Sequence, residues 1–242
     1  MPVIVEVVVS RLTTFVVGLT LLVAVVLGCP GYLTHPERTR IYDIRIVDSQ
    51  LTHVAVIGDS YTNGTDLGGR GPKSWTARAW RALAQHGVPI AADVAAEGGA
   101  GYGVPGDHGS VFGDLTARAV KPDDALVVFF GSRNDQGVDL GLLADRAFAD
   151  FDVARHIAPS ARLLVIGPPW PTADVPDSVL QIRDVLNAAA RGVGAAFVDP
   201  IVDRWFVDRP DLIGGDGVHP NDAGHAYLAE KIAPLIHTQL SQ

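Results

Sequence analysis

The sequence predicts an α/β fold: a three-layer α/β/α sandwich around a mostly parallel, five-stranded sheet. Five short apolar runs, bounded by Gly, Asp or Pro, have the composition of strands that helices cover on both faces. Helical patterns alternate with these runs, and serial strand–helix units favour a parallel sheet. With 242 residues, 48% of them hydrophobic, the chain can bury a large core. The five runs are residues 54–57, 91–95, 125–130, 163–166 and 196–198.

Four helices are predicted between and after these strands. Ser74 can cap a helix that runs to Gly87, and another helix runs from about 140 to 158, where Pro159 stops it. The third carries apolar residues at helical spacing and ends near 192, and the fourth begins near 222. The core-facing stripes are Trp75, Ala79 and Leu83 in the first helix, Val179, Ile182 and Leu186 in the third, and Leu228, Ile232, Leu235 and Ile236 in the fourth.

The N-terminus differs in composition from the rest of the chain. Residues 12–28 are apolar or neutral throughout, long enough for a tilted membrane span or the core of a signal sequence. A buried helix of the folded domain is the alternative, which the lack of a polar face disfavours. We therefore expect an anchor or signal segment over 1–29, a connecting segment over 30–49 and a catalytic domain over 50–242. Membrane association follows, with the cytoplasmic face and export both left open, because basic residues flank the segment on both sides.

Charge and cysteine content exclude several classes of protein. The formal charge is −8 and no basic run is present, so a nucleic-acid partner is not expected. The single cysteine, Cys29, excludes an internal disulfide and a cysteine-rich metal site. Cys29 follows a stretch that loosely resembles a lipoprotein processing site, so its lipidation stays open.

A serine follows the first predicted strand, in the run Gly58-Asp59-Ser60-Tyr61. A serine at a strand-to-helix turn is exposed at the top of the sheet, where helix-terminal amides favour a developing negative charge. Ser60 is therefore a candidate nucleophile. An ordinary Gly-Asp-Ser turn is the alternative interpretation.

The far end of the chain carries a candidate base. Asp216 and His219 lie three residues apart at the entry to the last predicted helix, so the carboxylate can fix the imidazole tautomer. A serine hydroxyl needs such a base to act as a nucleophile. Alternatively, Asp216 and Asn221 only satisfy turn backbone and cap the helix.

Two further loops follow strands at the same predicted edge. Residues 98–103 (GGAGYG) allow close approach of backbone to a ligand, and residues 131–135 (GSRND) offer the amide side chain of Asn134 as a donor. Each loop alone has an ordinary explanation as a turn.

Together the four segments resemble the SGNH, or GDSL, hydrolase superfamily over about residues 50–240. The resemblance implies a flavodoxin-like α/β/α fold and assigns Ser60 as nucleophile and His219 with Asp216 as the rest of a triad. It implies an oxyanion hole formed by the amides of Ser60 and Gly101 and the side chain of Asn134. Neither a metal nor an organic cofactor is then required.

Two departures from the family pattern concern the oxyanion hole. Gly131 is separated from Asn134 by two residues where the family has one, so either Ser132 replaces the usual glycine or the loop is longer by one residue. In the glycine loop, Ala96 stands where the family often has asparagine. The orientation of Asn134 is therefore left open.

The loops around the site offer candidate substrate contacts. Arg133 could bind an anionic group, and the aromatic rings could line an acyl or sugar site, although packing and ordinary ion pairs explain them equally well. The candidate contacts are Asp59, Tyr61, Arg133, Trp170 and Trp205.

The acyl acceptor separates three functional hypotheses. The four segments are also similar to actinobacterial octanoyltransferases of methylglucose lipopolysaccharide biosynthesis, which implies octanoyl transfer, with octanoyl-coenzyme A as possible donor, to a sugar hydroxyl such as that of a glucosylglycerate. An ester hydrolase that uses water is the second hypothesis. A catalytically silent carbohydrate-binding module is the third.

Overall fold

The structure of the protein is a computed structural model that describes residues 51–242. The predicted segments 1–29 and 30–49, with Cys29, lie outside the described residues. Within residues 51–242, no helix is both long and apolar enough to cross a membrane. Membrane association through the N-terminal segment therefore stays a prediction.

The sheet has five strands, as predicted, and all neighbours pair in parallel. Their order across the sheet is β2-β1-β3-β4-β5, the flavodoxin-like arrangement. Each observed strand begins and ends within two residues of the apolar run that predicted it. The strands are β1 (Thr52–Gly58), β2 (Ile90–Ala96), β3 (Leu126–Phe130), β4 (Arg162–Ile166) and β5 (Ala196–Val198).

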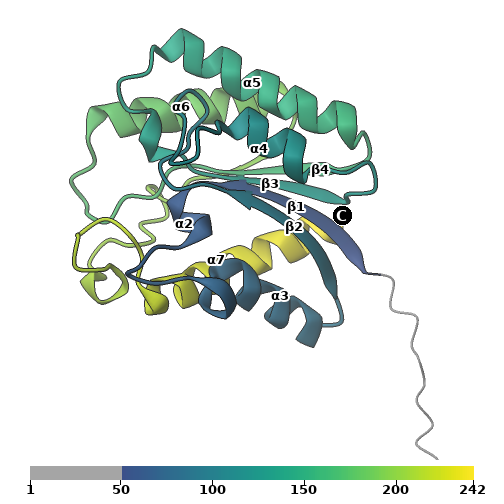
Figure 1. Cartoon of the computed structure of the whole chain (residues 1–242), viewed down its shortest axis with the longest axis horizontal. Coiled ribbons are helices and arrows are strands. Elements are labelled where there is room, and N and C mark those ends of the chain that lie inside the picture. The colour runs from purple at the N-terminus through teal and green to yellow at the C-terminus, as the bar shows by residue number, and fades with distance from the viewer. Residues whose placement is uncertain (1–50) are drawn as a thin grey trace, which may run out of the picture. The chain divides into compact units, whose positions relative to one another are not determined.

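Helices cover both faces of this sheet and complete the three layers (Figure 1). One face carries α4 (Phe112–Ala119), α5 (Leu140–Ile157) and α6 (Asp177–Gly192). The other carries α3 (Trp75–Gln85) and α7 (Asp222–Leu240). The four predicted helices are confirmed, whereas α4 and the one-turn α2 (Ser60–Asn63) were not predicted. Three short 3₁₀ helices complete the described elements: η1 (Gly71–Lys73), η2 (Arg133–Asp135) and η3 (Pro210–Leu212).

Alternating residues of the central strands supply both halves of the core. In β1, Ala55 and Ile57 pack with the α4–α5–α6 layer, while Val54 and Val56 pack with the α3–α7 layer. All four side chains are fully buried, as the period of two along a strand between two helical layers requires.

The edge strand β2 differs from the prediction that every strand is covered on both faces. Its Val94 is 44% exposed, and its Asp93 pairs with Lys121 at 2.7 Å. Because β2 lies at the edge of the sheet, with β1 as its one neighbour, the helical layers cover β2 less completely than they cover the central strands.

The strand order brings the candidate residues together. The chain first places β2 on one side of β1 and then β3 on the other, so a topological switch point lies between β1 and β3. Ligands of open α/β sheets bind in the crevice at the carboxyl ends of strands at such a point. The loops after β1, β2 and β3 are those that carry Ser60, Gly101 and Asn134.

Candidate active site

Ser60 begins the one-turn helix α2 directly at the end of β1. Asp59 holds this turn, because its Oδ1 accepts a hydrogen bond from the Tyr61 amide at 2.9 Å. The Asp59 side chain points into the protein and is 1% exposed. It therefore supports the turn from the interior and offers no surface to a substrate. Burial raises the pKa of Asp59 to about 7, although the hydrogen bond from the Tyr61 amide and the positive charge of Arg133 lower this pKa.

Ser60, His219 and Asp216 form one hydrogen-bonded chain. The Ser60 Oγ lies 3.1 Å from the His219 Nε2, and the His219 Nδ1 lies 2.6 Å from the Asp216 Oδ2. The carboxylate accepts a hydrogen bond from Nδ1–H, which leaves Nε2 free to accept the serine proton. This is the order of contacts that serine nucleophile activation requires.

The Asp216 carboxylate remains charged under ordinary conditions. Desolvation alone would raise its pKa, but hydrogen bonds from the His219 ring and from the amides of Val218 and His219 lower the pKa to about 2. The two amide bonds to Oδ1 are 2.9 and 3.0 Å long. Asp216 therefore both shapes the turn and orients the imidazole, so the two interpretations of this residue describe a single arrangement.

Tyr61 links the nucleophile turn to the base. Its hydroxyl donates to the Val218 carbonyl at 2.5 Å, one residue before His219. The ring is 1% exposed and meets Phe130 and Phe206 edge-on. This position makes Tyr61 a support of the His219 turn and leaves almost none of its surface for a substrate.

The loops after β2 and β3 are joined by two sets of hydrogen bonds. The Ala100 carbonyl accepts from the Ser132 hydroxyl at 3.0 Å and from the Asn134 Nδ2 at 2.8 Å. The buried Asp135 carboxylate accepts from the amides of Tyr102, Gly103 and Val104. Ser132 was considered from the sequence only as a replacement for the family's usual glycine, and Asp135 was not singled out. No local pattern marks Asp135, because the amides that it binds lie 31–33 residues earlier in the chain.

The predicted oxyanion donors are partly engaged with protein groups. The Gly101 amide donates to the Val104 carbonyl at 2.8 Å, and a Cβ at Gly101 would lie 2.5 Å from the Asp135 Oδ1. Gly101 is thus required by close packing, whereas its role as an oxyanion donor stays a prediction. The Asn134 Nδ2 lies 3.5 Å from the Asp59 Oδ2, which places this side chain beside the nucleophile turn. The Ser60 amide is the first of α2 and has no acceptor within the helix.

Arg133 and Trp170 come together from neighbouring loops. The Arg133 guanidinium lies 4.2 Å from the centre of the Trp170 ring, a cation–π contact. The Arg133 Nη1 is buried and has no hydrogen-bond partner among the described residues. By contrast, Trp205 is 3% exposed and packs in the α3–α7 side of the core, as plain packing predicts.

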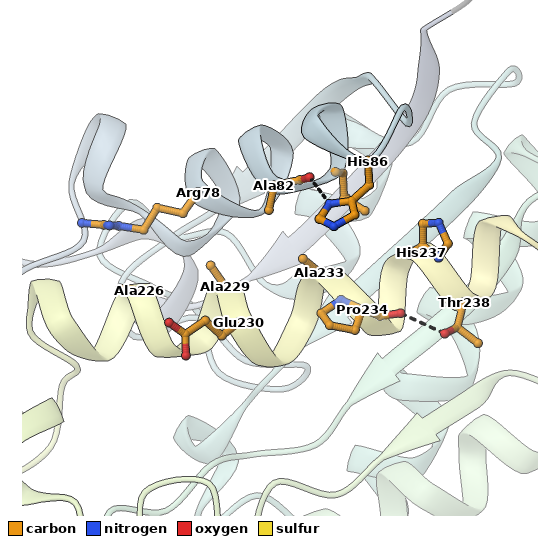
Figure 2. A pocket seen from close by; sticks show the side chains of 11 residues that line it. Arg78, Ala82, His86, Ala226, Ala229, Glu230, Ala233, Pro234, His237 and Thr238 are labelled. Atoms are coloured by element: carbon orange, nitrogen blue, oxygen red, sulfur yellow. Dashed lines mark hydrogen bonds between the residues drawn. The ribbon is translucent and has the colours of Figure 1, made fainter.

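Two cavities within residues 51–242 lie in different parts of the fold. The larger, of about 600 Å³, is a groove between α3 and α7 lined by residues such as Ala82, Ala229 and Pro234 (Figure 2). No loop at the carboxyl end of a strand lines it. The smaller, of about 380 Å³, is lined by two loops, one of which carries Asp216 and His219. Among residues 51–242, no three His, Cys, Asp or Glu side chains are grouped so as to hold a metal ion.

Comparisons with known proteins agree with this geometry. The model of the GDSL-like Lipase/Acylhydrolase family matches residues 56–227, a range that includes Ser60, Gly101, Asn134, Asp216 and His219. The chain is 68% identical over 234 residues to "GDSL lipase Rv0518" of Mycobacterium tuberculosis, covering 96% of this chain and 99% of that protein.

Solved structures share the fold at low sequence identity. TesA superposes with a TM-score of 0.62 at 22% identity, covering 78% of this chain and 99% of that one. A family 2 carbohydrate esterase of Corynascus thermopiles superposes with a TM-score of 0.63 at 22% identity, covering 80% of this chain and 68% of that one. These likenesses confirm the three-layer α/β/α architecture.

Proposed function

Because the chain belongs to the GDSL-like lipase/acylhydrolase family, it is an enzyme of the acyl hydrolase and acyltransferase type, and we propose that it hydrolyses carboxylic esters through an acyl-enzyme on Ser60. The observation that carries this proposal is the chain of hydrogen bonds from the Ser60 Oγ through His219 to Asp216. The relative described as a lipase favours water as the acyl acceptor. Family membership also favours an enzyme over a silent carbohydrate-binding module.

Acylation begins when the His219 Nε2 takes the hydroxyl proton of Ser60. The Ser60 Oγ then bonds to the ester carbonyl carbon, and the carbonyl oxygen becomes an oxyanion. When the intermediate collapses, the bond from carbon to the alcohol oxygen breaks, and His219 gives its proton to that oxygen. The alcohol leaves, and an acyl-enzyme remains on Ser60. Asp216 stabilises the imidazolium between these two proton transfers.

Deacylation repeats these steps with water. His219 takes a proton from a water molecule, whose oxygen bonds to the acyl carbon. The bond to the Ser60 Oγ then breaks, His219 returns the proton to Ser60, and the carboxylic acid leaves. The predicted oxyanion donors are the Ser60 amide, the Asn134 Nδ2 and, once its bond to the Val104 carbonyl opens, the Gly101 amide. Each such donor contributes about 2.7–4 kcal/mol in serine hydrolases.

The proposal is tested by replacing the nucleophile and the base. Ser60→Ala and His219→Ala should each lower kcat for p-nitrophenyl octanoate by about 10⁶-fold, the loss seen when serine or histidine is removed from such a triad. Ser241→Ala, at the exposed end of the chain, is the matched control and should keep the wild-type rate. Unchanged circular dichroism would show that each variant folds. Wild-type activity in Ser60→Ala would exclude the acyl-enzyme.

Transfer of a medium-chain acyl group to a sugar hydroxyl is a second candidate function. The Arg133–Trp170 pair supports it, since a buried guanidinium nitrogen without a protein partner can bind a carboxylate or a phosphate. A glucosylglycerate acceptor carries the first group and an octanoyl-coenzyme A donor carries the second.

Product analysis separates the two candidates. The enzyme is incubated with octanoyl-coenzyme A or an octanoyl ester, with and without a glucosylglycerate. Acylated sugar would support transfer. Octanoate as the sole product, at a rate that the sugar does not change, would leave hydrolysis as the function.

A further inference from the structure

The smaller cavity shares a wall with the turn that carries the base. Residues 208–210, 213, 214 and 217 line one side of it, and residues 171–173, in the loop after β4, line the other. Within the first side, the Gly214 amide donates to the His219 carbonyl at 2.7 Å. The wall of the cavity and His219 therefore belong to the same hydrogen-bonded turn.

The turn that this cavity borders indicates which part of a substrate the cavity could bind. In the proposed reaction His219 gives its proton to the leaving alcohol, so the alcohol must lie on the His219 side of the nucleophile. The oxyanion must lie by the loops of Gly101 and Asn134, and no residue of those loops lines the cavity. We infer that this cavity binds the alcohol portion of the ester, and the acceptor alcohol where transfer occurs. This inference rests on the proposed function.

The lining indicates a polyhydroxylated alcohol such as glycerol or a sugar. Pro171, Pro210 and Ile213 provide apolar surfaces against which C–H groups can pack. The Asp208 carboxylate is 90% exposed, and its ion pair with Arg204 is long at 3.4 Å. It is therefore available to accept hydrogen bonds from hydroxyl groups.

Two substitutions in the cavity test this inference. Ala173 is exposed, so Ala173→Trp fills the cavity without overpacking the core. Asp208→Asn removes the charge at nearly constant shape, and asparagine tolerates the positive φ of 62° at this position. Val202→Trp is the matched control, because Val202 is 67% exposed and does not line the cavity.

The measurement is kcat/KM for four esters: acetyl and octanoyl esters of methanol and of glycerol, followed by acid release. Both cavity variants should lower the ratio of glycerol ester to methyl ester about tenfold, for either acyl chain. The ratio of octanoyl to acetyl should stay unchanged, and Val202→Trp should change neither ratio. Asp208→Asn keeps the test valid if the tryptophan variant does not fold.

Three results contradict the inference in different ways. Unchanged alcohol and acyl ratios in both variants would mean that the cavity binds neither part of the ester. A changed acyl ratio with a constant alcohol ratio would assign the cavity to the acyl chain. If the wild-type protein hydrolysed none of the four esters, the proposed function would fail, and the cavity assignment would fail with it.

Discussion

Ser60 and His219 are 159 residues apart in the chain, and yet their side chains meet at 3.1 Å. The acidic member of the triad is close in sequence to the base, since Asp216 lies three residues before His219. Asp216 also shapes the turn that presents His219. Tyr61 adds a link between the two ends through the Val218 carbonyl. The turn of the predicted base is thus held by Asp216, close to it in sequence, and by Tyr61, the residue after the predicted nucleophile.

At the residue scale, Asn134 gives the sharpest test of the predicted oxyanion hole. Asn134→Ala should lower kcat for p-nitrophenyl octanoate by about 10²–10³-fold with little change in KM, since the lost donor acts on the oxyanion. Its side chain also holds the Ala100 carbonyl, so thermal unfolding must be measured beside the kinetics.

Asn134→Asp provides the matched control, because it keeps the shape and loses the donor. A rate like that of Asn134→Ala would support a donor role. Wild-type kcat in both variants would mean that Asn134 only supports the loop after β2.

At the element scale, Asn221 joins α7 to the turn that carries the base. Its Oδ1 caps α7 by accepting from the Ala223 and Gly224 amides, and its Nδ2 donates to the carbonyls of Asp211 and Ile213. The start of α7 and the loop before His219 are therefore held by one side chain.

Asn221→Ala should destabilise the protein by about 1–2 kcal/mol and also lower kcat, because the cap and the loop restraint are lost together. Urea unfolding and esterase kinetics measure the two effects. Glu230→Ala, on the exposed face of the same helix, is the control and should change neither by much. Lost stability with a wild-type kcat would show that the cap does not position His219.

The two helices that the sequence did not predict are short. The helix α4 spans eight residues, has no side-chain N-cap bond from Val111, and contains Gly113 and Thr116, which are weak helix formers. Its buried residues Phe112, Leu115 and Ala119 pack against the core, and packing of this kind stabilises short helices more than propensity does.

At the scale of the whole molecule, buried acids make stability depend on pH. Burial raises the pKa of Asp150 in α5 to about 7, as it does for Asp59. The folded chain then holds protons that the unfolded chain, with pKa values of 3.8, has already released. The contribution of these two protonated carboxyl groups to the free energy of unfolding is complete below about pH 4. This contribution falls as the pH rises to about 7.

Asp150→Asn should remove part of this dependence. At pH 8 the variant should have a higher urea midpoint than wild type, because no charge is buried, and at pH 4 the difference should vanish. Asp152→Asn, exposed two residues further along α5, is the control and should follow the wild-type curve. Parallel curves for wild type and Asp150→Asn would contradict a buried, titrating Asp150.

Local patterns predicted much of the fold and part of the site. Apolar runs located all five strands, and helical spacing with the caps Ser74 and Asn221 located four helices, because these signals lie within one segment. Asp216 and His219 were found for the same reason. Asp135 was missed because the amides that it binds lie 31–33 residues away, where spacing carries no signal.

The sequence by itself determined the parallel α/β architecture and the identity of the three side chains that form the candidate triad. Periodicity and short spacings carry this information without any contact between distant segments. Only the tertiary structure decided that Gly101 bonds to Val104, that Asp59 and Trp205 face inward, and that a cavity borders the turn that carries His219. Each of these depends on how separate loops pack at the end of the sheet, and that packing is set by the whole fold.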